Sequence, residues 1–401
     1  MYIDRRLTLR KAETVGILER MCQSLELTAT QYDTAKGRYE VVGAWLAQAD
    51  DPILHAAVSI YLQGSTALGT TVKPIGQNEH DVDLVAFIAG LGELPPAAVK
   101  KAIGDRLRAN GHYAPLLEEM PRCWRLNYAN EFHLDITPSI RNAECGNGGE
   151  LVPDKTLKEW KASNPKGYAA LFRRRTDLQP RMRMMKADGT QDRARADSVE
   201  PYPRAGGLKG ILRRTVQVAK RHRDVYFDRA DAGLAPISVI LTTLAAQSYE
   251  YCVTRFVYDD ELDVVRDIIR YMPVFIETRM DYGRRQWFIW NETTSGENFA
   301  EKWNKDPGRA EAFFAWHTRV TSDLDRLVDV EGIDRLSKSL SESFGPAPVT
   351  RAFDALTEEV SSARRTSRLF VAPSIGLTTV APATAASAAT AVRPNTFFGA
   401  P

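Results

Sequence analysis

The chain has 401 residues, 44% of them hydrophobic and 26% charged, with a formal net charge of +2; this fits one large or two ordinary globular domains and excludes a fibrous or largely disordered chain. Its four cysteines lie far apart without a Cys-x-x-Cys pair, which argues against a structural zinc site and favours a reducing compartment. No uncharged apolar run approaches the ~18–20 residues of a membrane span, and the charged start MYIDRRLTLRK is unlike a signal peptide, so we expect a cytoplasmic protein without a membrane partner.

The first predicted element is a long helix over residues 28–48. Thr28 and Gln31 have the spacing of a capping box. Apolar residues from Tyr32 to Leu46 then recur every three or four positions, as on one face of a helix. The pattern predicts a helix whose role is packing.

The next stretch, from Gln63 onward, carries the first chemical signal. Gly64 and Ser65 follow an apolar strand-like run and predict a turn whose N–H groups and hydroxyl contact an anion at a helix start. Asp81 and Asp83 lie on a following strand, facing the same side about 6–7 Å apart at ~3.3 Å of rise per residue. Such carboxylates resist burial unless a cation neutralises them, and Mg²⁺ takes carboxylates together with substrate phosphates.

A third acidic residue follows at Asp135. Residues 95–110 predict a helix, and the strand-like runs 122–128 and 131–137 predict a β-hairpin. Alternation within the second run places Asp135 on the side away from its apolar residues. We expect Pro138 to end that strand.

Together the three carboxylates form a catalytic hypothesis. Asp81, Asp83 and Asp135 on neighbouring strands can bind two metal ions about 4 Å apart. One ion lowers the pKa of an attacking hydroxyl, and the other holds a triphosphate and stabilises the leaving pyrophosphate. The alternative is that Asp81 and Asp83 are ordinary strand-edge residues. The Gly-Ser turn upstream and the third aspartate favour the catalytic interpretation.

The second half of the chain differs in pattern. Residues 141–206 lack a clear period and are predicted to be mostly irregular, whereas helices are expected from about residue 207 onward. The Lys/Arg-rich stretch 166–229 is either a solvated face or an electropositive wall for nucleotide phosphates or nucleic acid. Residues 371–401 are dominated by Ala, Thr, Pro, Ser and Val and are predicted to be a disordered tail.

The order of these motifs resembles a known superfamily, the polymerase-β-like nucleotidyltransferases. The segments LQGSTALGTTVKP, HDVDLVAFI, FHLDITPSI, VQVAKRHRD and APISVILTTLAA are similar to its bacterial cGAS/DncV-like branch, the CD-NTases. The resemblance implies a bilobal α+β fold with a mixed β-sheet N-lobe and a mostly helical C-lobe. It places the catalytic lobe at 1–205, with the long N-terminal helix packing on both lobes. The oligoadenylate-synthase-like helical lobe follows at 206–370.

The resemblance also implies an activity. Such enzymes condense nucleoside triphosphates into a cyclic di- or trinucleotide, release pyrophosphate, and serve anti-phage signalling. The residues implied as catalytic and as ligands of two Mg²⁺ ions, with Mn²⁺ as a substitute, are Asp81, Asp83 and Asp135. The residues implied to bind nucleotide are Gln63, Gly64, Ser65, Lys220 and Ser238.

The expected partners are ATP, GTP or other NTP substrates and a downstream effector that the cyclic nucleotide activates. The terminal FFGAP is similar to tails that a ubiquitin-transfer-like partner conjugates. No zinc-ligand cluster of the animal relatives is visible, so no DNA activator is expected. One departure is Asn291-Glu292-Thr293, where relatives often carry Asn-Pro or Asp-Pro.

Two alternatives stay open from the sequence. The first is a transferase of the same fold that makes linear 2′–5′ oligonucleotides or modifies another acceptor. The second is an inactive scaffold that binds nucleotide or protein. The intact carboxylates argue against the scaffold, because an inactive relative is free to lose them.

Overall fold

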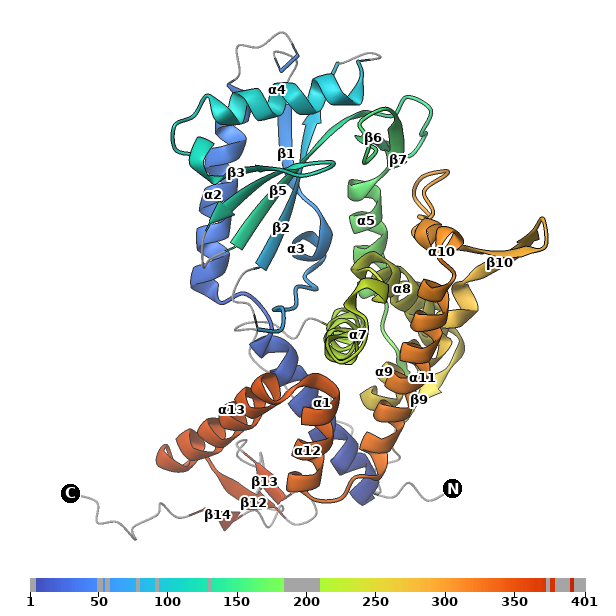
Figure 1. Cartoon of the computed structure of the whole chain (residues 1–401). Coiled ribbons are helices and arrows are strands. Elements are labelled where there is room, and N and C mark those ends of the chain that lie inside the picture. Colours follow the sequence, from blue (N-terminus) through green and yellow to red (C-terminus); the bar gives the residue numbers. More distant parts are fainter. Residues whose placement is uncertain are drawn as a thin grey trace.

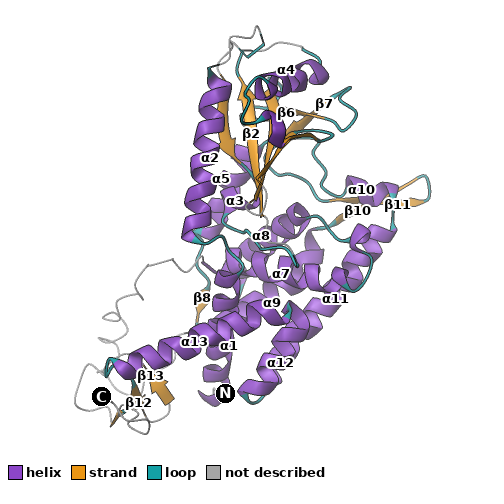
Figure 2. Ribbon diagram, turned by 60° about the vertical axis from the view of Figure 1, so that its left-hand side comes forward, coloured by secondary structure: helices purple, strands orange, loops and turns teal. Residues whose placement is uncertain are grey.

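The protein forms two lobes in a computed structural model of the chain (Figure 1). The structure describes residues 5–48, 53–54, 58–76, 80–90, 94–128, 132–183, 210–372, 376–378 and 390–392. The predicted lobe boundary at 205/206 lies outside these residues. Figure 2 shows the main sheet in one lobe and most of the helices in the other.

A mixed sheet forms the N-lobe, as predicted. Its order is β1 (Val58–Leu62), β2 (His80–Ile88), β5 (Phe132–Arg141), β4 (Trp124–Tyr128) and β3 (Leu117–Glu119), with β6 (Glu150–Pro153) and β7 (Trp160–Ser163) extending from β5. Strands β2 and β5 run parallel, and the other neighbours are antiparallel.

The predicted pairing of β4 with β5 is confirmed, but the predicted strand end at Pro138 is wrong. Strand β5 continues to Arg141. Strand β4 begins at Trp124, opposite Ile136. At Pro138, strand β5 is therefore paired with β2 alone. A residue without an N–H is tolerated where one side of the strand has no ladder partner.

Two helices cover one face of this sheet, α2 (Ala29–Ala47) and α4 (Pro96–Arg108). The capping box that starts α2 is present, since Thr28 Oγ1 accepts from the N–H of Gln31 at 3.2 Å and Gln31 Oε1 accepts from the N–H of Thr28 at 3.0 Å. Apolar side chains of β2, β4 and β5 fill the space beneath the helices. The polar side chains of the same strands therefore face the other way, toward the helical lobe.

The helical lobe confirms most of the predicted helices. From residue 210 onward, the α-helices of the described chain are α7 (Gly210–Asp228), α8 (Ser238–Arg255), α9 (Glu261–Tyr271), α10 (Glu301–Lys305), α11 (Gly308–Asp329), α12 (Ile333–Phe344) and α13 (Pro346–Arg365). Short 3₁₀ turns lie at Ala114–Leu116, Ala232–Leu234 and Met272–Phe275. The sequence did not predict α13 or the projecting hairpin of β10 (Glu277–Asp281) and β11 (Arg284–Phe288) (Figure 1).

The region predicted to be irregular contains a helix, α5 (Pro165–Thr176), whose N-cap Asn164 accepts from the N–H of Gly167. Together with α3 (Gly64–Leu68), α5 packs on α7 and α8 through a shared apolar cluster. A short parallel pair, β8 (Arg181–Met182) with β9 (Val257–Tyr258), adds a second link between the segments. The two lobes are therefore joined by a shared apolar cluster as well as by the connecting chain.

The long helix predicted over residues 28–48 is present as α2, and it was expected to pack on both lobes. The buried residues of α2 belong to the N-lobe core. A separate helix, α1 (Arg5–Ser24), packs on α13, α9 and α7 and contributes Ile17, Leu18 and Met21 to the core of the helical lobe. Residues 5–24 therefore belong to the helical lobe and not to the catalytic lobe predicted for 1–205.

The tail needs a partial correction. Residues Phe370–Ala372 (β12), Gly376–Thr378 (β13) and Thr390–Ala391 (β14) form a small three-stranded sheet at positions predicted to be disordered. The other tail residues lie outside the described part of the chain. No helix among the described residues is long and apolar enough to cross a bilayer.

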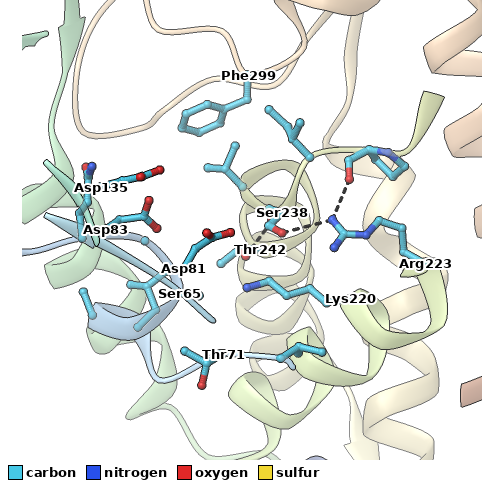
Figure 3. Close-up of a pocket in the computed structure, with 18 of the residues that line it drawn as sticks. Ser65, Thr71, Asp81, Asp83, Asp135, Lys220, Arg223, Ser238, Thr242 and Phe299 are labelled. Atoms are coloured by element: carbon cyan, nitrogen blue, oxygen red, sulfur yellow. Dashed lines mark hydrogen bonds between the residues drawn. The ribbon is translucent and has the colours of Figure 1, made fainter. Parts of the chain in front are cut away.

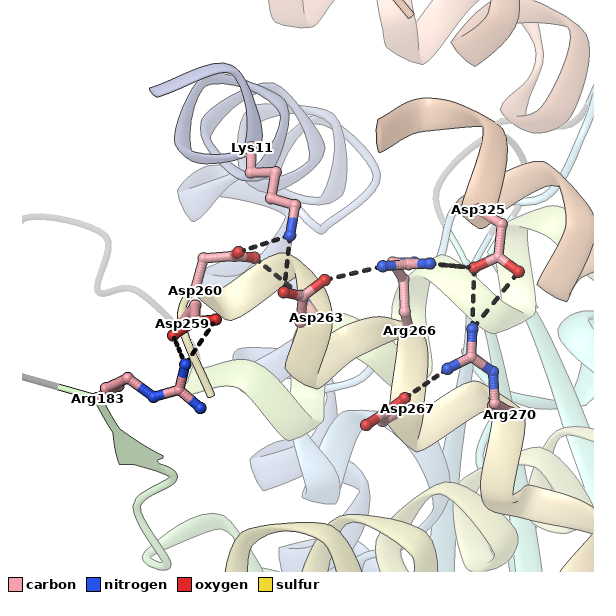
Figure 4. A network of polar contacts seen from close by, with 9 residues as sticks. All are labelled: Lys11, Arg183, Asp259, Asp260, Asp263, Arg266, Asp267, Arg270 and Asp325. Atoms are coloured by element: carbon pink, nitrogen blue, oxygen red, sulfur yellow. Dashed lines mark hydrogen bonds and ion pairs between the residues drawn. The ribbon is translucent and has the colours of Figure 1, made fainter. Parts of the chain in front are cut away.

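A buried lysine joins α1 to α9 (Figure 4). Lys11 Nζ lies 2.9 Å from Asp260 Oδ2 and 2.7 Å from Asp263 Oδ2, and the Lys11 and Asp260 side chains are only 11% and 10% exposed. Lys11→Met leaves two neighbouring carboxylates without their shared cation. We expect it to lower the free energy of unfolding by about 3 kcal/mol, measured by urea unfolding.

The matched control for this prediction is Arg183→Gln. Arg183 pairs with Asp259 at 3.1 Å in the same network, but the two side chains are 53% and 40% exposed. An exposed pair contributes at most about 1 kcal/mol. Equal losses in the two variants would contradict a structural role for the burial of Lys11.

Candidate active site

A cavity of about 980 Å³ lies between the lobes. This is the upper end of the ~300–1,000 Å³ range of small-molecule pockets. The lining contains every residue predicted to act at the site: Gln63, Gly64, Ser65, Asp81, Asp83, Asp135, Lys220 and Ser238. Folding therefore gathers residues from both halves of the chain around one space large enough for substrates.

The carboxylates converge because of strand register. Strands β2 and β5 are parallel with Asp83 directly opposite Asp135, and Asp81 precedes Asp83 by two residues on the same face. Figure 3 shows all three side chains on one side of the cavity. Burial, followed by the charges of Asp135 and Asp81, raises the pKa of Asp83 to about 7. The smaller contribution, from the charges of Asp135 and Asp81, is the repulsion between neighbouring carboxylates that the sequence spacing predicts.

An arginine that the sequence reasoning missed contacts this trio. Arg125 lies opposite Asp135 on β4. Its Nε and Nη2 donate to Asp135 Oδ1 and Oδ2, each at 2.7 Å, and Nη2 is 3.6 Å from Asp81 Oδ1. Among the described residues, no three acidic, histidine or cysteine side chains are close enough to enclose a metal ion. A cation that enters the trio must therefore displace or share the contact of Arg125 with Asp135.

The cavity wall formed by α7 carries two cations, Lys220 and Arg223, of which Arg223 pairs with Asp224 at 2.6 Å. Lys220 of α7 is 4% exposed and donates to Thr70 O at 3.0 Å and Thr70 Oγ1 at 3.1 Å. Burial, with a smaller effect of Arg223, lowers its pKa to about 7. Arg223 Nη1 donates to Ser238 Oγ at 3.2 Å and to Pro236 O at 2.9 Å (Figure 3). Arg223, which the sequence did not single out, thus fixes the start of α8 beside Lys220.

The turn at Gly64 requires glycine. Gly64 has φ +63°, and a Cβ at this position would overlap Asp83 Oδ2. Gly64→Ala must therefore move the central carboxylate of the trio. Because a displacement of ~1 Å at a reacting centre costs about 100-fold in rate, we expect a loss of that order in the activity that the sequence predicts. Product formation over time measures it.

The control is Gly76→Ala. Gly76 has φ +70°, but no atom lies within 4 Å of an added Cβ. This variant carries the backbone strain without the overlap. If both alanine variants lose activity equally, strain and not the position of Asp83 is responsible.

The raised pKa of Asp83 gives the metal-free protein a characteristic pH dependence. The folded pKa of about 7 exceeds the ordinary 3.8, so folding favours the protonated carboxyl between these values. The stabilisation is complete below pH 3.8 and is lost as the pH rises through 7. In EDTA we expect a higher melting temperature at pH 5.5 than at pH 7.5, and a smaller difference in Asp83→Asn. An unchanged difference would contradict the assignment.

Comparison with known proteins identifies the family. Residues 13–175 match the Second Messenger Oligonucleotide or Dinucleotide Synthetase domain. A c-di-GMP synthase from Roseivirga ehrenbergii is 31% identical over 392 residues, which cover 97% of this chain and 98% of the relative. The chain belongs to the CD-NTases. It is a nucleotidyltransferase of the cyclic dinucleotide synthase family, which confirms the enzyme predicted from the sequence.

Other CD-NTases support the assignment. The cyclic dinucleotide synthase CdnG from Bradyrhizobium diazoefficiens is 28% identical over 250 residues, 58% of each chain. Its structure in complex with GTP aligns with a TM-score of 0.65 at 20% identity, over 86% of this chain and 99% of that one. Vibrio cholerae DncV aligns with a TM-score of 0.51 at 14% identity, over 86% and 91%. These likenesses confirm the predicted bilobal polymerase-β-like fold.

The departure at residue 291 of this CD-NTase has a structural role. Glu292 accepts two hydrogen bonds from the buried Arg175 guanidinium, at 2.6 and 2.9 Å. Asn291 is buried and donates from Nδ2 to Glu297 Oε2 at 2.7 Å. The segment after β11 is thus tied to α5, and Asn291, Glu297 and Phe299 from it line the cavity.

Proposed function

We propose that this CD-NTase condenses two molecules of GTP into c-di-GMP and releases two molecules of pyrophosphate. The observation that carries the proposal is the register that sets Asp83 beside Asp135 at a cavity that Lys220 enters from the other lobe. The relative that aligns over almost the whole chain is named as a c-di-GMP synthase, which supports guanine as the base.

The donor set fits a divalent metal. Three carboxylates offer oxygen ligands only, which suits Mg²⁺ or Mn²⁺. The contact of Arg125 with two of them shows that this position already favours positive charge. We propose that Asp81, Asp83 and Asp135 hold two Mg²⁺ ions, for which Mn²⁺ can substitute. The bound metal would neutralise phosphate charge and lower the pKa of the attacking hydroxyl.

The residues of the chain would divide the remaining work. The first N–H groups of a helix lack intrahelical partners, so Gln63, Gly64 and Ser65 at the start of α3 would contact the triphosphate. Lys220 and Ser238 would hold the same phosphates from the helical lobe. A ribose hydroxyl oxygen then bonds to the α-phosphorus, the bond to pyrophosphate breaks, and the hydroxyl proton leaves on the side of Asp135. A second transfer of the same kind closes the ring.

The test is a product assay. Purified protein with Mg²⁺ and all four NTPs, and then with GTP alone, is expected to give a phosphatase-resistant product that chromatography and mass spectrometry identify as c-di-GMP. A product that phosphatase degrades to nucleosides would favour the linear alternative. Absence of any product with every NTP would favour the scaffold.

The proposal also includes the predictions about biological partners and role. They are a downstream effector that the cyclic nucleotide activates, anti-phage signalling, and a ubiquitin-transfer-like partner at the C-terminus. Residues 393–401, which would carry the last contact, lie outside the described part of the chain. Mass spectrometry of the protein from cells that carry its neighbouring genes tests the last prediction, because an unmodified C-terminus throughout would contradict it.

A further inference from the structure

A largely buried carboxylate, Glu297, lines the cavity in addition to the three aspartates. It lies between β11 and α10, and its pKa is raised by burial, with hydrogen bonds from Asn291 and Ser163 and the charge of Arg122, another residue of the cavity lining, opposing the rise. No lysine or arginine of the described residues forms an ion pair with it. A further hydrogen bond from an N–H donor would stabilise the charged form of this largely buried carboxylate.

The segment holds Glu297 in a defined position. The backbone N–H of Asn291 donates to Glu297 O at 2.9 Å, and residues Trp290 and Asn298 form a β-bridge. Asn291 Nδ2 donates to Glu297 Oε2 at 2.7 Å, and Ser163 Oγ lies 3.4 Å from Oε1. An ionised carboxylate has about four acceptor sites. Both oxygens of Glu297 therefore keep acceptor capacity for a ligand in the cavity.

An aromatic ring accompanies the carboxylate. Phe299, two residues on, lines the same cavity (Figure 3). Tyr168 meets its ring edge-to-face, with centroids 6.0 Å apart. Aromatic faces are common platforms for stacked bases, but stacking does not distinguish one base from another. Any choice of base must come from polar groups beside the ring.

Guanine fits a lone carboxylate better than the other bases do. Its Watson–Crick edge presents two adjacent donors, N1–H and the 2-amino group. Adenine, cytosine and uracil each present a single donor beside a ring or carbonyl acceptor, which would face the second carboxylate oxygen. A base acceptor that faces a buried carboxylate oxygen leaves both groups without a donor. This weakens binding more than the simple loss of one hydrogen bond.

We propose that the Glu297 carboxylate reads guanine by accepting its N1–H and 2-amino hydrogens, and so makes this enzyme selective for GTP over ATP. This specificity role rests on the proposed function, which supplies the nucleotide substrate. Asn291 is a positioning residue, because it holds one carboxylate oxygen while the other face stays open to the base. The test therefore measures base preference and not activity alone.

The first experiment uses the wild-type protein. Calorimetric titration with α,β-methylene analogues of GTP, ITP and ATP in Mg²⁺ compares the bases without turnover. Two hydrogen bonds to guanine predict binding of the GTP analogue about 5- to 150-fold tighter than that of the ATP analogue. The ITP analogue lacks only the 2-amino group and is expected to bind about tenfold more weakly than the GTP analogue. Equal binding of GTP and ITP analogues overturns the proposal.

The second experiment uses Glu297→Gln. Its amide places a donor against one guanine donor, so the GTP-to-ATP ratio is expected to fall close to one, and adenine is expected to enter the product when both NTPs are supplied. A merely structural role would weaken both nucleotides equally. The control is Glu301→Gln: Glu301 accepts from Lys161 at 2.9 Å and does not line the cavity, so its ratio is expected to match the wild type.

The two proposals fail separately. If the wild type makes c-di-GMP while Glu297→Gln keeps its preference for GTP, the role of Glu297 is overturned and the function stands. If the wild type binds the GTP analogue selectively but yields no cyclic product, the proposed function is overturned, while the role of Glu297 in selecting guanine is retained. The comparison of GTP with ITP decides the matter even if the glutamine variant does not fold.

Discussion

Asp83→Asn is expected to lower cyclic dinucleotide synthesis by about a thousandfold or more, the scale of removing a central catalytic group. Asp83 is the middle carboxylate of the trio, opposite Asp135 in register and against Gly64. Asparagine keeps the shape but removes the charge that binds metal. Because burial and two like charges already raise the pKa of Asp83, the metal-free variant is expected to melt at the same temperature as the wild type or higher.

Product assays and thermal melts in EDTA check this expectation. The matched control is Asp105→Asn on α4, whose carboxylate accepts from Lys101 and Arg108 outside the cavity. It is expected to keep full activity. Retained activity in Asp83→Asn would overturn the catalytic assignment. A lowered melting temperature would instead contradict the repulsion inferred for the trio.

Asp135 illustrates how the structure changes an expectation drawn from the sequence. Repulsion alone predicts that Asp135→Ala leaves stability unchanged or higher, as for Asp83. The two hydrogen bonds from Arg125 argue otherwise, because alanine would leave the guanidinium beside Asp81 without its main partner. This pairing could not be read from the sequence, because the spacing of the two strands along the chain does not specify the register of β4 against β5.

Local patterns predicted what local geometry determines. The period-two alternation placed Asp81, Asp83 and Asp135 on one sheet face, and the capping box at Thr28 placed the start of α2. Both depend on residues within a few positions of each other, and both are confirmed. The match at Lys220 came from the family resemblance, and α7 does bring it to the cavity.

Elements that depend on distant partners were not predicted. Helix α1 owes its place to Lys11 and to apolar contacts with α9 and α13, more than 200 positions away. The start of helix α5 has a local sequence signal, because Asn164 is its N-cap and Pro165 its first residue. The proline was instead interpreted as part of an irregular loop. Hairpin β10–β11 is almost wholly exposed along β10 and lacks the alternation that marks a half-buried strand.

Lys220→Met is expected to weaken GTP binding about 10- to 150-fold, the effect of losing hydrogen bonds to a charged group. The lysine is buried beside Thr70, on the wall that faces the carboxylates, and methionine keeps most of its volume. Calorimetric titration with a non-hydrolysable GTP analogue measures the loss. The control is Lys338→Met on α12, an exposed lysine outside the cavity, which is expected to bind as tightly as the wild type.

Proton uptake separates a phosphate contact from a structural role. With a pKa lowered to about 7, Lys220 is only partly charged at pH 7.5 before GTP arrives. A triphosphate beside the amine favours its charged form and raises its pKa, so binding takes up a fraction of a proton. Titrations in buffers of different ionisation enthalpy are expected to show this uptake in the wild type and its loss in Lys220→Met. If the variant takes up the same proton, Lys220 does not contact the phosphates, and the weaker binding must come from distortion of α7.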